Sequence, residues 1–149
     1  MAEYLVLPGV QTVANATPTP MNASIPCRKG YIIHEDGTGI FILRGITQNC
    51  SAKYLVRWNA NIAVPEGGTV GPIAMAIVLN GEPIFATRAI ATPTAVDQYF
   101  NISVEKEVIV PKGCCFNIAV EPVTAYNDTT APAAAINIQD GRFGITRTA

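Results

Sequence analysis

Hydrophobic and polar residues alternate with a period of two along most of the chain, a pattern that predicts β-strands. The clearest example is residues 53–64, where one face would be apolar and the other polar. The apolar face comprises Tyr54, Val56, Trp58, Ala60 and Ile62. The other face, polar except for Leu55, comprises Lys53, Leu55, Arg57, Asn59 and Asn61. A strand buried on one face is typical of antiparallel sheets. No segment keeps apolar residues at helical spacing between caps, so the pattern predicts an all-β fold.

Residues 73–79 are apolar on both faces. They therefore need cover from a second layer or from a neighbouring subunit. Asn80-Gly81 follows directly and predicts a tight hairpin turn, with a return strand beginning at Pro83.

The remaining strands are separated by Gly, Pro and Asn residues that predict turns. Residues 30–44 read as a hairpin around Asp36-Gly37, and residues 100–110 as a long strand in which Lys106 interrupts the buried face, marking a bulge or an exposed middle. Residues 116–120 resume the alternation after a turn at 111–113. Residues 136–145 form a last strand or a hairpin, with Asp140-Gly141 as its turn. Eight to ten antiparallel strands indicate a sandwich or a barrel.

Residues 1–26 differ from residues 27–149, which form the main domain. A short apolar run, Tyr4–Leu7, precedes a segment rich in Thr, Ala and Pro. Pro18 and Pro20 cannot donate ladder hydrogen bonds, so this segment is an edge strand or an extended arm. As an arm it would be an attachment device, whose apolar contacts would be Tyr4, Leu5, Val6, Leu7, Val10 and Val13; the alternative is an ordinary first strand with a loose lead-in.

Composition favours an oligomer without nucleic acid. Hydrophobic residues make up 49% of the chain and charged residues 14%. Either both faces of several strands are covered, or subunits bury extra surface against each other, and the low charge content favours the second. The net charge is −1 and no basic run occurs, which argues against direct nucleic-acid binding. With no basic, apolar leader and no apolar run of about 18 residues, we expect neither a signal peptide nor a membrane span, and we expect synthesis in a cytoplasm.

Few residues offer chemistry, so we expect no catalytic residue, cofactor or metal, and no enzyme. His34, the only histidine, lies just before a predicted turn, and the carboxylates are scattered. Asp36, Asp128 and Asp140 are interpreted as turn residues rather than calcium ligands. We interpret the four cysteines, Cys27, Cys50, Cys114 and Cys115, as small buried hydrophobes without a zinc site.

Several segments, in order, resemble the jelly rolls of the tumour necrosis factor-like and complement globular-head family. The segments are Gly37–Leu43, Tyr54–Pro65, Ala76–Ile84, Phe100–Val104, Val110–Val120, Ile136–Ile138 and Phe143–Ile145. The resemblance implies a trimeric jelly-roll β-sandwich. Tyr31, Trp58, Tyr99 and Phe143 are the residues expected at its subunit interface.

Two motifs further resemble small proteins encoded by bacteriophages and prophages of Gram-positive gut bacteria. One is the Pro-Cys-x-x-Gly-Tyr-x-x-His-x-Asp-Gly-x-Gly stretch at 26–39, and the other is Gly-Cys-Cys at 113–115. This resemblance implies a decoration protein on the outer surface of a virion, bound to the major capsid protein and made in the host cytoplasm. The alternative is a receptor- or carbohydrate-binding tip of a fibre or baseplate. It would use Tyr31, Tyr99 and Tyr126, or the loops 66–71 and 126–132.

Overall fold

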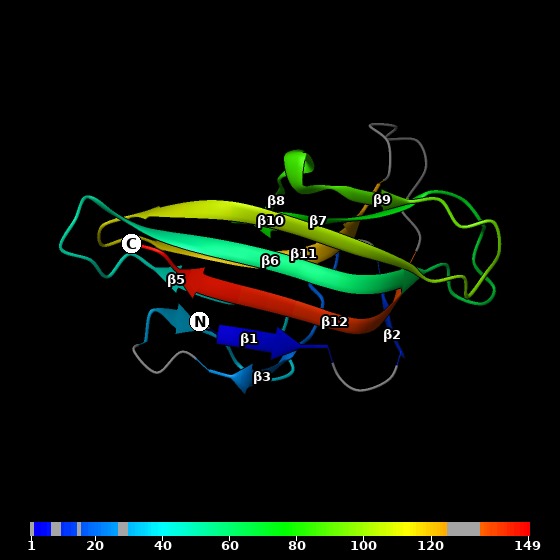
Figure 1. Cartoon of the computed structure of the whole chain (residues 1–149), viewed down its shortest axis with the longest axis horizontal. Coiled ribbons are helices and arrows are strands. Elements are labelled where there is room, and N and C mark those ends of the chain that lie inside the picture. The colour runs from blue at the N-terminus through cyan, green and yellow to red at the C-terminus, as the bar shows by residue number, and fades with distance from the viewer. Residues whose placement is uncertain (1, 7–9, 15, 27–29, 125–134) are drawn as a thin grey trace.

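The chain forms a two-layered β-sandwich in a computed structural model that describes residues 2–6, 10–14, 16–26, 30–124 and 135–149. The first sheet has the order β10 (Phe100–Pro111), β6 (Ser51–Ala63), β12 (Ile136–Arg147), β1 (Ala2–Leu5) and β3 (Asn22–Ile25), and β2 (Val10–Val13) also pairs with β12. Figure 1 shows this sheet facing the viewer. The second sheet has the order β4 (Ile32–Ile33), β5 (Phe41–Arg44), β11 (Cys115–Val123), β7 (Ile73–Leu79) and β8 (Glu82–Pro83), and β9 (Ala89–Ala91) pairs with β7.

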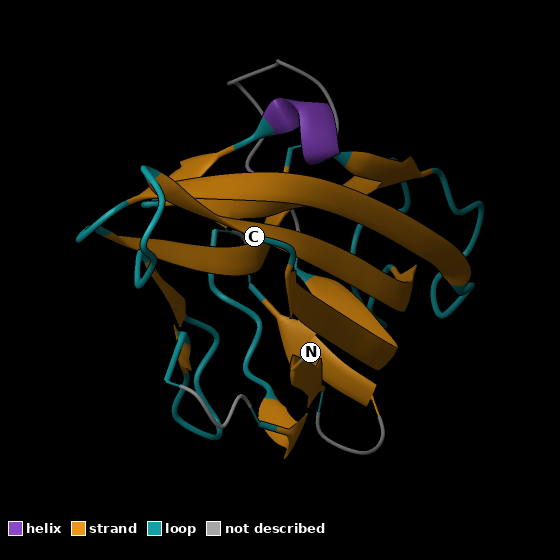
Figure 2. Cartoon of the chain, turned by 60° about the vertical axis from the view of Figure 1, so that its left-hand side comes forward, coloured by secondary structure: helices purple, strands orange, loops and turns teal. Residues whose placement is uncertain are grey.

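The strand pairing establishes a jelly roll. The principal pairs are nested in sequence: β1 with β12, β5 with β11, β6 with β10, and β7 with β9, all antiparallel. In a jelly roll, nested antiparallel pairs of this kind are divided between the two sheets of the sandwich. Among the described residues, one 3₁₀ turn, η1 (Phe85–Thr87), lies between β8 and β9 at an edge of the sandwich (Figure 2). The expected fold class is confirmed, with four short strands beside the eight principal ones.

Large aromatic side chains fill the space between the sheets. Trp58, Tyr54, Phe41 and Phe143 are all fully buried. The Phe41 ring lies 5.0 Å from Phe143, which meets Trp58 edge-on at 6.4 Å. The predicted inward face of β6 is confirmed, since Tyr54, Val56, Trp58, Ala60 and Ile62 all have no exposed area.

Strand β7 is buried on both sides, as its sequence predicts. Its inward residues Ile73, Met75 and Ile77 join the main core, while Ala74 and Ala76 form a small separate cluster with Val123. Because these alanines are already buried within one chain, the apolar outer face of β7 does not itself require a neighbouring subunit.

The N-terminal segment is part of the sandwich rather than a free arm. Strand β1 lies between β12 and β3, and the backbone then crosses to the second sheet, where Ala16 and Thr19 donate N–H bonds to the carbonyls of Pro122 and Val120 at 3.1 and 3.0 Å. The N-terminal segment thus continues the hydrogen bonding along β11 beyond Ile118, where the pairing of β11 with β5 ends. Of the two alternatives for this segment, the described residues follow the strand.

The structure decides between two pairs of local alternatives. Residues 136–147 form one continuous strand, β12, so the expected turn at Asp140-Gly141 is corrected to a β-bulge, where the register shifts between Gln139 and Arg142. Lys106 lies in an exposed middle of its strand and not at a bulge, because β10 pairs with β6 without interruption from Phe100 to Pro111. The Asn80-Gly81 hairpin is confirmed, with φ of 50° and 84°. No helix in the described ranges is long and apolar enough to cross a membrane.

Candidate functional site

The outer face of the second sheet carries an exposed apolar strip, formed by Ile33, Ile40 and Ile42. Ile33 pairs with Ile42 across β4 and β5, and their side chains point away from Phe41 and Leu43, which are buried in the core. Ile33 and Ile40 are 47% and 49% exposed. The outer face of a sheet normally carries polar residues, so three adjacent isoleucines indicate a contact surface.

A shallow hollow of about 270 Å³ continues the apolar strip towards β7 and β11. Ile40, Pro18, Val78 and Ala119 line it, with Glu121 at its side. Partial burial raises the pKa of the Glu121 carboxyl above its ordinary value of 4.5. The charged group is therefore poorly solvated there, and removing more water from it would favour its protonated form.

The outer face of the first sheet is polar and internally hydrogen-bonded. The Asn101 side-chain amide donates to the Oδ1 atoms of Asn59 and Asn61 at 3.1 and 3.2 Å. Two residues further along the same pair of strands, Arg57 Nε lies 3.1 Å from Glu105 Oε2, and both side chains are largely exposed. These β6 and β10 side chains satisfy one another, so this part of the face is a weaker candidate for a docking surface than the apolar strip.

The N-terminal residues expected to bind a partner are mostly inside the domain. Tyr4, Val6 and Val13 are 2%, 6% and 3% exposed because β1 and β2 pair with β12 and turn these side chains into the core. Of the members of this set whose side chains the structure describes, Leu5 alone projects outward, at 38% exposure. Leu7 and the side chain of Val10 lie outside the described residues. Tyr4, Val6 and Val13 are therefore corrected to core residues.

The residues expected at a subunit interface divide in the same way. Trp58 and Phe143 have no exposed area, because both occupy inward positions of the first sheet, and they are corrected to core residues. Tyr31 and Tyr99 are partly exposed. The Tyr31 ring is covered on one side by the Arg147 guanidinium, 4.0 Å from the ring centre.

His34 is half-buried and packs against aromatic residues of the core. Its ring stacks on Phe41 at 4.2 Å and meets Tyr4 edge-on at 4.7 Å, while Nε2 lies 2.8 Å from the carbonyl oxygen of Thr38. Nε2 therefore carries the proton and donates it to Thr38. In the described part of the chain, no three His, Cys, Asp or Glu side chains lie close enough to share a metal ion.

Two of the three turn aspartates are described. Asp36 Oδ1 accepts the Ala23 backbone N–H at 2.9 Å and so joins the β4–β5 turn to β3, while Asp140 occupies the bulge. Asp128 and the loop 126–132 lie outside the described residues.

The three cysteines that the structure describes are not buried hydrophobes. Cys50, Cys114 and Cys115 are exposed free thiols, since they lie in a loop, a turn and the exposed start of β11; Cys27 lies outside the described residues. The loop and the turn are joined by backbone bonds, from Lys112 N to Cys50 O and from Gly45 N to Cys114 O.

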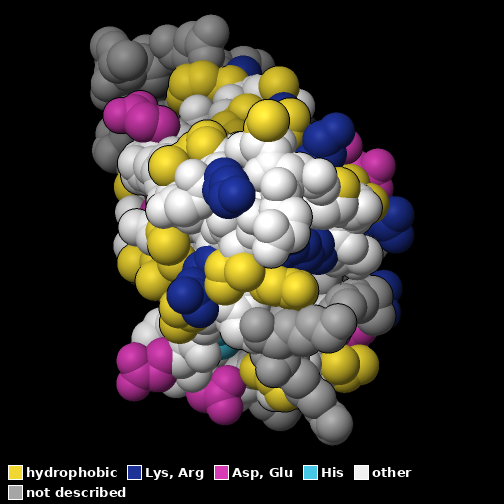
Figure 3. All heavy atoms as spheres, turned by 90° about the vertical axis from the view of Figure 1, so that its left-hand side faces the viewer, with side chains coloured by type: hydrophobic (Ala, Val, Ile, Leu, Met, Phe, Trp, Pro, Cys, Tyr) yellow, Lys and Arg dark blue, Asp and Glu magenta, His cyan; other side chains and the backbone are white. Residues whose placement is uncertain are grey.

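Figure 3 shows the left-hand end of Figure 1, where hydrophobic side chains form separate patches with Lys and Arg between them.

Comparisons with known proteins yield similarity of structure only. No family model matches the sequence, and no curated protein matches it. The globular domain of a zebrafish complement 1qA protein aligns at a TM-score of 0.49 and 13% identity, over 99% of this chain and 98% of that one. The C-terminal domain of EclA, a sugar-binding protein, aligns at 0.42 and 17%, over 96% of this chain and 82% of that one. The jelly-roll fold of this chain is established by its own strand pairing.

Proposed function

We propose that this chain is a non-enzymatic structural protein, a homotrimer that decorates the outer surface of a phage capsid. The observation that supports docking is the apolar strip of Ile33, Ile40 and Ile42 on the second sheet. The sequence motifs at 26–39 and 113–115 support the assignment to phage particles. In this proposal the apolar strip, and not a detached arm, contacts the major capsid protein.

The size of the strip favours a capsid lattice as its occupant over a second copy of the chain. A stable interface between two proteins buries about 800 Å² on each partner, far more than three isoleucines present. A trimer that docks three small apolar contacts on a repeating lattice gains affinity by multivalency, without needing a large contact on any one subunit. Weak single contacts and three-fold repetition suit a decoration protein.

Location is tested by quantitative mass spectrometry and imaging of purified particles of the phage that encodes the chain. We expect hundreds of copies spread over the head, and absence from particles would overturn the proposal. A few copies at the tail would instead support the receptor-binding alternative. Light scattering at micromolar concentration should give the mass of three chains of 15.8 kDa. A monomer would contradict the trimer.

The docking surface is tested with the double variant Ile33→Asp, Ile40→Asp and particles stripped of the protein. We expect at least tenfold weaker binding, because each carboxylate would have to lose its water at the contact. Ile109→Asp is the matched control, an isoleucine that is 50% exposed on the first sheet. Equal binding by both variants would remove the strip from the proposal.

A further inference from the structure

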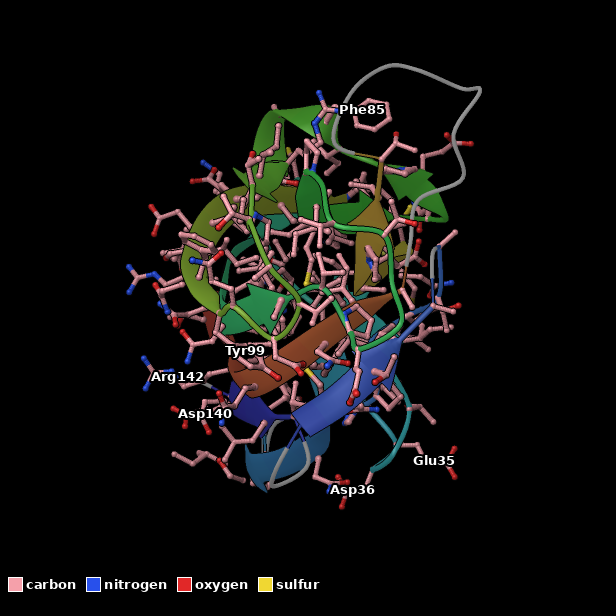
Figure 4. All side chains as sticks on the ribbon, turned by 90° about the vertical axis from the view of Figure 1, so that its right-hand side faces the viewer. Glu35, Asp36, Phe85, Tyr99, Asp140 and Arg142 are labelled. Atoms are coloured by element: carbon pink, nitrogen blue, oxygen red, sulfur yellow. The ribbon has the colours of Figure 1, made fainter. Side chains whose placement is uncertain are left out.

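The bulge of β12 opens a polar groove on the first sheet, away from the apolar strip. One extra residue lies between Gln139, which faces Asn61, and Arg142, which faces Asn59. Gly141 is buried at this point, and its two neighbours Asp140 and Arg142 both remain exposed. Figure 4 shows both side chains projecting from the same side of the domain. A regular strand would place fewer side chains here, so the bulge directs an added polar group towards solvent.

The groove has a volume of about 520 Å³, in the range of small-molecule sites. Polar groups and apolar surface both line it. The polar groups are the carboxylates of Glu3 and Asp140, the guanidinium of Arg142, the amides of Asn22 and Asn59 and the hydroxyl of Ser24, and the apolar lining includes Leu5, Val6 and Ala23.

The charged side chains in the groove are not neutralised by one another. Among the residues that the structure describes, Glu3, Asp140 and Arg142 form no ion pair, and no side-chain hydrogen bond satisfies them. Asn22 likewise has no side-chain partner in the described ranges, whereas Asn59 is already held by Asn101. The groove therefore presents unused donors and acceptors side by side.

We propose that this groove binds a neutral saccharide, one or two sugar rings in size. An anion would be repelled by the two carboxylates, and a small cation held by them would leave the Arg142 guanidinium and the Asn22 amide without a partner. A purely apolar ligand would strip water from all three charges. Sugar hydroxyls donate to carboxylates and accept from guanidinium and amide groups, which matches the mixture present. The C–H face of a ring can pack on Leu5 and Ala23.

The test is amide chemical-shift mapping by NMR with glucose, galactose, rhamnose, N-acetylglucosamine, maltose and cellobiose. We titrate each sugar to about 50 mM, because so small a ligand in one shallow site binds in the millimolar range. At least one sugar should shift the amides of Leu5, Asn22 and Arg142. No shift with any of the six, or shifts confined to another surface, would overturn the proposal. Stronger responses to choline or glucuronate would also overturn it.

Variants separate binding from folding. Asp140→Asn keeps a residue that tolerates the φ of 54° at this position, and Arg142→Gln keeps a donor. Each should weaken the sugar response about tenfold, since a charge-assisted hydrogen bond is lost. Arg57→Gln, on the same sheet face but outside the groove, should leave the response unchanged. An unchanged response in both groove variants would refute the site. Because capsid docking is assigned to the other sheet, the outcome does not depend on the proposed function.

Discussion

Gly141 lies directly against the ring of Trp58 in the core. A Cβ at position 141 would come within 2.7 Å of Trp58 Cη2 and 2.5 Å of Val6 Cγ2, closer than real Cβ contacts. The bulge is therefore held between Val6, which follows β1, and Trp58 of β6, because only glycine fits between these two side chains.

The Gly141→Ala variant should consequently be destabilised, by about 1–3 kcal/mol for an overpacked core. Gly144→Ala on the same strand is the control, since nothing lies within 4 Å of a Cβ at that position. Urea unfolding of both variants measures the difference. Equal midpoints would mean that the bulge yields easily, and the groove would then be less firmly defined than we infer.

The contact of Gly141 with Val6 and Trp58 explains why the sequence pattern predicts a turn at Asp140-Gly141, where the structure has a bulge. An Asp-Gly pair marks a position where the backbone takes positive φ, and both a tight turn and a bulge require this. The choice is made by Val6 and Trp58, which lie far away in the sequence. Alternation along β6 and the Asn80-Gly81 turn depend on neighbouring residues only, and these were predicted correctly.

Long-range strand pairing also decides whether the N-terminal segment is a strand of the sandwich or a free arm. Its prolines correctly excluded a central ladder position for residues 18–20, but nothing local indicates that β1 pairs with β12 at the opposite end of the chain. The groove could not be predicted either, because Glu3, Asn22, Asn59 and Arg142 come from four separate strands.

Tyr54 connects the core to the edge of the second sheet through its hydroxyl. The buried side chain donates to the carbonyl oxygen of Arg44 at 2.5 Å and also lies 3.3 Å from that of Tyr31. Tyr54→Phe should lower the free energy of unfolding by about 1 kcal/mol, because buried carbonyl groups lose a donor. Thermal unfolding of this variant should show a lower midpoint than that of Tyr31→Phe, whose ring is partly exposed.

Lys106 protects an open edge of the first sheet. Its position in the register lies on the core side of β10, opposite Val56, yet its side chain is exposed. Among the strands that the structure describes, β10 pairs only with β6. A charge on the inner face of an edge strand discourages pairing with another chain. Lys106→Val should therefore increase concentration-dependent association above that of the parent chain, measured by light scattering.

The neighbouring Glu107→Val is the control for Lys106, since this residue is exposed on the outer face of the same strand. If the two variants associated equally, added hydrophobicity and not loss of edge protection would be the cause.

Glu121 should make the stability of the domain fall as pH rises. Desolvation raises the pKa of this carboxyl in the folded state, so the native protein binds more protons than the unfolded chain between the two pKa values. The stabilising effect of the protonated form is complete below the unfolded pKa and is lost as pH passes through the folded one. Glu121→Gln should raise the thermal midpoint at neutral pH by about 1–3 °C, because the group is only partly buried.

The advantage of Glu121→Gln should disappear near pH 4, where both proteins carry a neutral side chain at position 121. Thermal scans at pH 4 and pH 7 measure this. Glu82→Gln, exposed at the start of β8, is the control and should show no pH-dependent difference from the parent chain. If Glu121→Gln were equally stabilising at both pH values, the gain would come from packing rather than from removing a poorly solvated charge. If the apolar strip docks on a capsid as proposed, the contact would cover Glu121 further. Capsid binding by the parent chain should then strengthen towards acidic pH, and binding by Glu121→Gln should not.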